Sequence, residues 1–173
     1  MSSTKPKALF LDRDGIINVD HGYVSKIKDF EFNEGIFETL LSLQSLGFLL
    51  IIVTNQSGIG RGYYSEEAYR ALTSYMVECF ADEGIRIDAV YHCPHTPDDA
   101  CKCRKPRTGM LKAAKKQFDI DMKNSWMIGD KESDMLVGKN AGVENRIFVS
   151  LKSKSEEATY SVKTVREIVE LVK

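Results

Sequence analysis

The chain has 173 residues, 43% of them hydrophobic and 28% charged, proportions typical of a globular protein that buries its own core. Its formal net charge of −1 excludes binding that relies on a strong overall field, such as non-specific binding to nucleic acid or to an anionic membrane surface. We therefore expect a single domain over residues 1–173, present as a monomer, that holds any anionic ligand with local groups.

The sequence contains no candidate targeting or membrane segment. The apolar run at residues 8–11 is too short for a signal peptide, and no later run approaches the roughly 20 apolar residues of a membrane span. These features predict a cytoplasmic protein. Because thiols stay reduced in the cytosol, the four cysteines are interpreted as metal ligands or packing residues, with Cys79 as a small core residue.

Short apolar runs alternate with longer amphipathic segments along the chain. The runs predict buried strands at residues 8–11, 49–53, 89–91, 126–128 and 147–149. The amphipathic segments predict helices at residues 36–46, 65–84, 108–118, 132–141 and 162–172. This alternation is typical of an α/β fold with a Rossmann-like, doubly wound parallel sheet, in which ligands bind at the carboxyl ends of the strands.

Two carboxylates follow the first predicted strand. Asp12 and Asp14 are two positions apart, so their side chains point the same way if the strand continues to them. Such a pair would repel unless a cation lay between the two groups, and hard oxygen ligands suit Mg²⁺. An acidic turn in which Gly15 supplies the bend explains the same tetrapeptide equally well.

Polar residues also follow two later strands. Thr54 begins the segment TNQSGIGRG, whose glycines could let backbone N–H groups face phosphate oxygens, although ordinary turns look similar. Asp130 follows the strand at 126–128 and is placed to share a metal with Asp12, or else to cap the next helix, while Asp134 could cap or orient the loop.

Arg104 and Lys105 precede the helix at 108–118 and could clamp a phosphate, although a solvated basic pair is the commoner meaning. None of these segments is decisive alone. Together, strand-end acids, a hydroxyl and a lysine describe phosphoryl transfer, in which one carboxylate attacks phosphorus and a second protonates the leaving alcohol.

A cluster of soft ligands occupies residues 93–103. Cys93, His95, Cys101 and Cys103 match a closed tetrahedral zinc site, and the turn-forming segment between them has no apolar anchor. Since the protein fills all four positions, we expect a structural zinc that fixes the residues after Cys103. His92, next to the cluster, is interpreted as a packing residue or as a residue that supports the cluster without binding the metal.

These segments resemble the haloacid dehalogenase (HAD) superfamily of aspartate-nucleophile phosphotransferases, whose motifs match DRDG, Thr54, Lys105 and GDKESD in order. Within it, residues 7–150 resemble the capless phosphatases that include histidinol-phosphatases and D-glycero-D-manno-heptose 1,7-bisphosphate 7-phosphatases. The strings INVDHGYV, TNQSGIGRG, CPH…CKCRKP and GML favour the heptose family. The short segment 96–100 also suits histidinol-phosphatases and leaves the anomer open.

The resemblance implies a role for each matched residue. Asp12 would be the nucleophile, Asp14 the acid/base, and Thr54 and Lys105 would stabilise the transferred phosphoryl group. Magnesium would be held by Asp12, Asp130 and the backbone carbonyl of Asp14. The substrate-binding set would be Asp20, His21, Gly22, Tyr23, Asn55, Gln56, Ser57, Arg104 and Lys131. From the residues alone, 20–23 could be a simple turn.

The resemblance also implies a reaction: loss of the C7 phosphate of a small sugar bisphosphate through an aspartyl-phosphate, in nucleotide-heptose synthesis for lipopolysaccharide core or surface glycans. Histidinol-phosphate phosphatase is the nearest alternative. A phospho-accepting signalling domain uses similar groups on a similar fold, but the D-x-D arrangement supplies an acid/base and favours turnover. A zinc-held interaction module with an inactive site is disfavoured, because every catalytic motif is intact.

Overall fold

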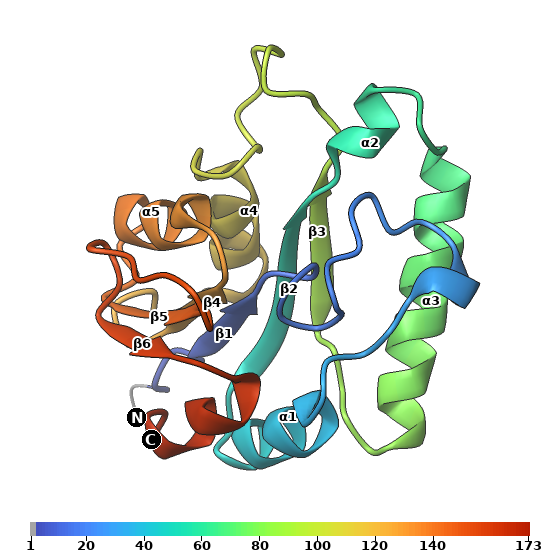
Figure 1. Ribbon diagram of the computed structural model, residues 1–173. Helices are drawn as coiled ribbons and strands as arrows, with labels where there is room; N and C mark the ends of the chain where they lie inside the picture. The colour runs from blue at the N-terminus through green and yellow to red at the C-terminus, as the bar shows by residue number, and fades with distance from the viewer. Residues whose placement is uncertain (1–2) are drawn as a thin grey trace.

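The computed structural model describes residues 3–173, so the first two residues of the expected domain lie outside the described part. Six strands alternate with helices along the chain (Figure 1). The strands are β1 (Ala8–Leu11), β2 (Leu49–Asn55), β3 (Ala89–Cys93), β4 (Trp126–Gly129), β5 (Asn145–Val149) and β6 (Tyr160–Val162). The α-helices are α1 (Ile36–Ser45), α2 (Ser57–Gly60), α3 (Glu66–Asp82), α4 (Gly109–Phe118) and α5 (Glu132–Asn140), and short 3-10 helices cover Ile27–Asp29 and Val165–Glu170.

The strands form one sheet in the order β3-β2-β1-β4-β5-β6, and every neighbouring pair is parallel. The first strand lies in the middle, between β2 and β4. Helices α1 and α3 cover one face of the sheet and α4 and α5 the other (Figure 1). The predicted doubly wound α/β fold is therefore confirmed, and the reversal of strand order on either side of β1 creates a switch point where ligands bind.

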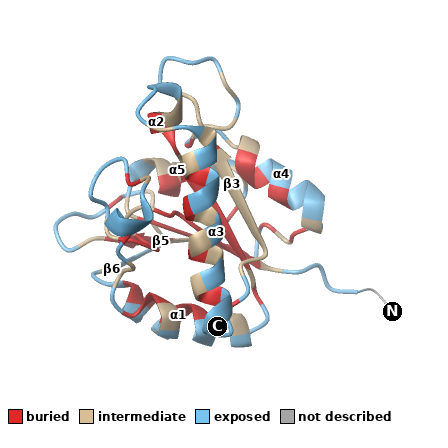
Figure 2. Cartoon of the chain, turned by 90° about the vertical axis from the view of Figure 1, so that its right-hand side faces the viewer, coloured by how far each residue is buried: buried red, intermediate tan, exposed pale blue. Residues whose placement is uncertain are grey.

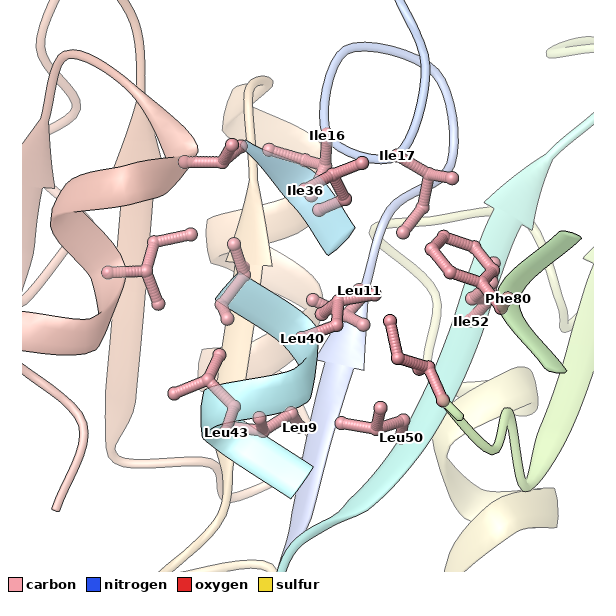
Figure 3. Packing of buried hydrophobic residues seen from close by; sticks show 14 of the residues in the cluster. Leu9, Leu11, Ile16, Ile17, Ile36, Leu40, Leu43, Leu50, Ile52 and Phe80 are labelled. Atoms are coloured by element: carbon pink, nitrogen blue, oxygen red, sulfur yellow. The ribbon is translucent and has the colours of Figure 1, made fainter. Parts of the chain in front are cut away.

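Side chains at alternate positions of the central strands point to opposite faces of the sheet and form two separate hydrophobic cores. Leu9, Leu11, Leu50 and Ile52 point to the face covered by α1 and α3, where they meet Ile36, Leu40, Leu43 and Phe80 (Figure 3). The neighbouring residues Ala8, Phe10, Ile51 and Val53 point to the other face and pack against Met110, Leu111 and Ala114 of α4. A sheet buried on both faces explains why these strands read as continuous apolar runs.

The amphipathic helices lie where the apolar spacing predicts them. Helix α3 begins after Ser65, whose Oγ accepts a hydrogen bond from the backbone N–H of Ala68 at 3.1 Å, as an N-cap does. Its buried residues line one side, and its opposite side is exposed (Figure 2). Cys79 is only half-buried on this helix, so its interpretation as a core residue is wrong.

The helix predicted at 162–172 is also wrong. Residues 160–162 form the edge strand β6, and a 3-10 helix over 165–170 follows it. Val165 and Ile168, which are buried against the α1 face, are three positions apart, and a 3-10 helix brings such residues onto one side. The apolar period here was therefore three residues instead of 3.6.

The segments above the carboxyl ends of the strands, of which residues 12–35 are the longest, have little regular structure. In the described residues they contain only α2 and the 3-10 turn at 27–29 as regular structure, so no large cap domain covers this edge. No helix of the described chain is both long and apolar enough to cross a membrane.

Candidate active site

The residues that follow β1, β2 and β4 meet at the carboxyl edge of the sheet, around a pocket of about 400 Å³. This arrangement follows from the parallel pairing of β1 with both β2 and β4. Most predicted catalytic and substrate residues line the pocket, namely Asp12, Asp14, Asp20, Gly22, Tyr23, Asn55, Gln56, Ser57, Arg104, Lys105 and Lys131.

Lys105 connects the pocket floor to two carboxylates. Its buried Nζ donates to Oδ1 of Asp12 at 2.9 Å, to Oδ1 of Asp134 at 2.6 Å and to the carbonyl of Val53 at 2.9 Å. Burial by itself would lower the pKa of Lys105, but the charges of Asp12 and Asp134 outweigh it and hold the pKa above its ordinary value. Lys105 is therefore an ammonium ion at the bottom of the pocket.

Asp12 is 4% exposed, and burial together with the nearby charge of Asp134 raises its pKa well above the ordinary value. Both donors that reach its carboxylate, Lys105 Nζ and the backbone N–H of Arg13, contact Oδ1. The positive charges of Lys105 and Lys131 act on this pKa in the opposite direction and lower it.

Asp14 has a different environment. Its Oδ1 accepts hydrogen bonds from Nη2 of Arg13 at 2.8 Å and from Nδ2 of Asn18 at 3.0 Å. Its Oδ2 accepts one from Nε2 of Gln56 at 3.0 Å. Three donors on two neighbouring elements thus fix the orientation of this carboxylate beside the pocket.

The side chain of Gln56 connects Asp14, Thr54 and Tyr64 by hydrogen bonds. Its Nε2 donates to Oγ1 of Thr54 at 2.9 Å as well as to Asp14, and its Oε1 accepts from the hydroxyl of Tyr64 at 2.5 Å. Burial raises the pKa of Tyr64 to about 12, so this hydroxyl stays a donor near neutral pH. Thr54 itself is fully buried, beneath the residues that line the pocket.

Asn55, at the end of β2, holds the backbone of Lys105 at two points. Its Oδ1 accepts from the N–H of Lys105 at 3.0 Å, and its Nδ2 donates to the carbonyl of Lys105 at 3.2 Å. The side-chain amide therefore serves the position of Lys105 in this structure, and the adjacent Arg104 lines the pocket beside it.

Carboxylate oxygens of Asp12, Asp130 and Asp134 lie within 4.8 Å of one another. Asp134 uses both oxygens on protein donors, because Oδ2 accepts from the N–H groups of Asp130 and Lys131 at 3.2 and 3.1 Å. Oδ1 of Asp130 is buried without a hydrogen-bond partner among the described residues, and its nearest cation is Nζ of Lys131 at 3.6 Å. A set of hard oxygens in which one buried atom receives no hydrogen bond fits a Mg²⁺ ion.

Gly15 makes this cluster possible. Its φ of +95° lies in the left-handed region, and a Cβ atom on it would overlap the carboxylate of Asp130. The bend that the sequence assigns to Gly15 is thus confirmed, and the same glycine gives Asp130 room to approach β1.

The pocket rim carries the remaining predicted substrate residues. Nζ of Lys131 lies 3.4 Å from Oδ2 of Asp20, so a residue after β4 meets a residue of the β1 loop across the rim. His21 lies outside the pocket, where its ring contacts Glu31 at 2.9 Å. Tyr23 lines the rim and meets Tyr63 edge-to-face with ring centroids 4.9 Å apart.

The glycine-rich segment TNQSGIGRG does not present the phosphate-facing loop that its sequence suggests. Residues 57–60 form helix α2, and the N–H groups of residues 59–62 donate to protein carbonyls instead of facing a ligand. Gly58 lies against the ring of Tyr64, and a Cβ on Gly60 would lie 2.6 Å from the carbonyl oxygen of Pro94. Close packing therefore explains these two glycines, and the predicted phosphate-facing loop is wrong for residues 59–62.

The predicted zinc ligands converge at the top of the sheet, where the loop after β3 rises beside α2 (Figure 1). Sγ of Cys93 lies 3.8 Å from Sγ of Cys101, and Nδ1 of His95 lies 3.3 Å from Sγ of Cys103. Burial raises the pKa of Cys93 to about 12, so a cation would be needed to ionise it. Four soft ligand atoms within 4.8 Å of one another fit a tetrahedral Zn²⁺ ion.

His92 stays outside this cluster. Its Nε2 contacts Oε2 of Glu66 at 3.0 Å, and its ring lies 4.1 Å from that of Tyr69. Its interpretation as a packing residue is confirmed.

Sequence reasoning missed four residues of the site. Arg13 and Asn18 donate hydrogen bonds to Asp14, and Tyr64 donates one to Gln56. Ser133 lines the pocket at the start of α5. The only available signal for Arg13 was its place inside the D-x-D segment. Asp134 had been expected to cap or orient its loop, which it does, but its contact with Lys105 was not foreseen.

Comparison with known proteins agrees with this geometry. Residues 102–168 match the HAD-hydrolase-like family. The D-glycero-alpha-D-manno-heptose-1,7-bisphosphate 7-phosphatase of Campylobacter jejuni is 50% identical, over 98% of this chain and 97% of the relative. The D-glycero-beta-D-manno-heptose-1,7-bisphosphate 7-phosphatase of Helicobacter pylori strain 26695 is 47% identical, over 96% of this chain and 98% of the relative.

A solved structure agrees as well. The crystal structure of D,D-heptose 1,7-bisphosphate phosphatase from B. bronchiseptica, complexed with magnesium and phosphate, superposes with a TM-score of 0.87 at 27% identity. The superposition covers 95% of this chain and 96% of that one. Identity of this level over nearly the full length of the curated relatives shows that the chain belongs to the family of HAD phosphatases that act as D-glycero-D-manno-heptose-1,7-bisphosphate 7-phosphatases.

Proposed function

We propose that this protein hydrolyses the C7 phosphate ester of D-glycero-D-manno-heptose 1,7-bisphosphate through an aspartyl-phosphate on Asp12. The carrying observation is the placement of two carboxylates with different partners at the end of β1, with the ammonium group of Lys105 2.9 Å from one of them. The names of the full-length relatives support the choice of substrate.

In the first half-reaction, a carboxylate oxygen of Asp12 attacks phosphorus. The bond from phosphorus to the sugar oxygen breaks, and the protonated Asp14 gives its proton to that oxygen, so the sugar leaves as an alcohol. Lys105 lies at hydrogen-bond distance from the nucleophile and stabilises the charge that develops on the phosphoryl oxygens. The hydroxyl of Thr54, which accepts a hydrogen bond from Gln56 at 2.9 Å, would assist from the end of β2.

In the second half-reaction, water attacks the phosphorus of the aspartyl-phosphate. Asp14, now a carboxylate, takes the proton of that water, and the bond from phosphorus to the Asp12 oxygen breaks to release inorganic phosphate. The hydrogen bonds to Asp14 from Arg13, Asn18 and Gln56 keep this group in place for both steps.

The ligand atoms available in each cluster determine which metal ion it would bind. Asp12, Asp130 and the backbone carbonyl of Asp14 would hold Mg²⁺, and when bound the ion supplies positive charge that keeps Asp12 ionised and offsets the charge of the phosphate. Cys93, His95, Cys101 and Cys103 would hold a structural Zn²⁺ that orders the loop before Arg104.

The substrate would lie in the open pocket with its second phosphate toward the cations of the rim. Arg104 and Lys131 supply those charges, while the sugar site is lined by Asp20, Gly22, Tyr23, Asn55, Gln56 and Ser57. His21 lies outside this lining, on Glu31, and has no part in the proposal. Because the rim consists of loops without a cap domain, specificity rests on the lining side chains and not on a closing lid. We propose that the enzyme works as a cytoplasmic monomer.

The test compares kcat/KM for the α and β anomers of heptose 1,7-bisphosphate with that for histidinol phosphate, and identifies the released phosphate by NMR of the sugar product. We expect one heptose anomer to exceed histidinol phosphate by ~10²-fold or more, because the rim cations would be left unpaired by a monophosphate. A preference for histidinol phosphate would overturn the proposed substrate. A long-lived acyl-phosphate without turnover would instead identify a phospho-accepting domain.

A further inference from the structure

Arg13 stands between Asp12 and Asp14 in the sequence, and its charge distinguishes it from the two neutral donors that also bind Asp14. Its side chain is almost completely buried, since the residue is 1% exposed. Nη2 donates to Oδ1 of Asp14 and to the carbonyl of Val24, each at 2.8 Å. The guanidinium carbon lies 5.9 Å from the centroid of the Phe30 ring.

This guanidinium is poorly satisfied for a buried group. Nε and Nη1 have no hydrogen-bond partner among the described residues, so only one of its three nitrogens is paired. Burying a cation costs free energy unless its donors are paired, and a well-packed apolar residue would usually stabilise the fold at least as well. A purely structural requirement therefore does not explain an arginine here.

The partners of Asp14 indicate what the charge does. Of the three donors on its carboxylate, Asn18 and Gln56 offer neutral amides, and Arg13 alone is a cation. A charge-assisted hydrogen bond is roughly twice as strong as a neutral one. Oδ1 accepts from both Arg13 and Asn18, whereas Oδ2 accepts only from Gln56 among the described residues, so Oδ2 is the oxygen with room to exchange a proton at the pocket.

We infer that Arg13 is the positioning residue of the acid/base. Its charge holds Oδ1 of Asp14 against the base of the β1 loop, so that the proton passes between Oδ2 and the leaving sugar oxygen, and later between the attacking water and Oδ2. The same guanidinium binds Val24 and so ties the far end of this loop to Asp14. The inference rests on the proposed function, because it concerns the same acid/base.

The experiment uses the full chain with Arg13→Met and Arg13→Lys and compares two phosphate esters. Heptose 1,7-bisphosphate has a poor leaving group that needs a proton, whereas p-nitrophenyl phosphate has a good one that does not. Single-turnover rates of alcohol or nitrophenolate release isolate the first half-reaction. Arg146→Met is the matched control, since Arg146 also donates from its guanidinium to backbone carbonyls, but on β5 and outside the pocket lining.

We expect Arg13→Met to slow release of the sugar by ~10²-fold, the lower end of what a positioned acid/base contributes, and release of nitrophenolate by less than about 3-fold. Arg13→Lys should recover part of the loss on the sugar substrate, and Arg146→Met should leave the ratio of the two rates unchanged. If Arg13→Met does not fold, Arg13→Gln replaces it under the same criterion, because it also lacks the charge.

Equal losses on both esters would show that Arg13 only maintains the fold and would overturn the inference. A wild-type enzyme that releases nitrophenolate but not heptose phosphate would overturn the proposed substrate instead. In that case an alkyl phosphate that the wild-type enzyme does hydrolyse takes the place of the heptose ester, and the same ratio still decides the role of Arg13.

Discussion

The two carboxylates at the end of β1 differ because their surroundings differ. Asp12 is buried against Lys105, whereas the Asp14 side chain is 18% exposed and receives hydrogen bonds from its own loop and from Gln56, the residue after β2. A buried carboxylate with an adjacent ammonium suits a nucleophile, because the ammonium lies close to the phosphoryl oxygens on which charge develops during attack. A partly exposed one with fixed orientation suits proton exchange with a leaving group and with water.

Removing either carboxylate should therefore give a distinct result. Asp12→Asn should abolish turnover and trap no phosphoenzyme, because the amide cannot form the acyl-phosphate. Asp14→Asn should slow turnover by ~10²–10⁴-fold while the enzyme can still be phosphorylated. Phosphate release and acid-stable labelling measure the two effects, and appreciable activity of Asp12→Asn would contradict the covalent mechanism.

Gly15→Ala tests the contact between the β1 turn and Asp130. An added Cβ would displace the carboxylate of Asp130, so the Mg²⁺ concentration that gives half-maximal activity should rise by at least ~10-fold. Gly47→Ala is the control, because Gly47 has a similar φ of +88° and nothing within 4 Å of its Cβ position. Both variants should lose about 1 kcal/mol of unfolding free energy, and an equal Mg²⁺ requirement in the two would contradict the prediction.

Single residues of the site could be predicted only where chain direction places them. Asp12, Thr54 and Asp130 follow apolar runs, and parallel strands bring their ends together, so the cluster was foreseeable. The contacts of Arg13 with Val24 and of Tyr64 with Gln56 depend on how loops fold back, and no periodicity reports that.

At the scale of elements, the loop between β3 and α4 is attached to the site at two points. Cys103 belongs to the soft-ligand cluster, and Lys105 is held by the side chain of Asn55. Between them, the side chain of Arg104 makes one long hydrogen bond among the described residues, of 3.5 Å to the carbonyl of His95. The proposed catalytic Lys105 and the proposed substrate-binding Arg104 therefore depend on the soft-ligand cluster to different degrees.

Removal of zinc should separate these two dependences. With a chelator, or in Cys101→Ser, we expect KM for the heptose substrate to rise by ~10-fold, equivalent to ~1.4 kcal/mol, because Arg104 loses its anchored neighbours. The value of kcat should change by less than about 3-fold, since Asn55, Asp12 and Asp134 still hold Lys105. Steady-state kinetics and zinc content check this, and a loss confined to kcat would contradict it.

The helices and strands that could be predicted from the sequence are those with a long or strongly periodic pattern of apolar residues. The central strands and helices α1, α3, α4 and α5 were foreseeable, because both faces of the sheet demand long apolar runs. The segment 160–170 was not, since β6 is a short edge strand whose residues are mostly exposed and the following turn repeats every three residues. A one-turn helix such as α2 carries too few residues for any period to appear.

At the scale of the whole molecule, the sheet separates two hydrophobic cores. Leu40 lies in the core beneath α1, and Leu111 lies in the core beneath α4; both are completely buried. The two cores contact different sets of residues on alternate positions of the same strands. They should therefore respond independently to substitution.

Leu40→Ala and Leu111→Ala should each lower the free energy of unfolding by ~2–5 kcal/mol, as deletion of a buried side chain does. In the double variant the losses should add to within ~0.5 kcal/mol, because the sites share no partners. Urea unfolding measures these values. Leu46→Ala, at a residue that is 48% exposed, is the control and should cost less than ~0.5 kcal/mol, whereas strong non-additivity of the core pair would show that the sheet transmits strain.

The central place of β1 has a consequence for how the protein reaches this state. Leu9 pairs with Trp126, so the neighbour of the first strand comes from the last third of the chain. Such distant pairing slows folding, and Asp12 and Asp130, the proposed Mg²⁺ ligands, come together only when β1 has paired with β4. Trp126 is the one tryptophan of the chain, and its ring stacks on Tyr160. The fluorescence of Trp126 during refolding should therefore report the step in which β4 pairs with β1 and activity can appear.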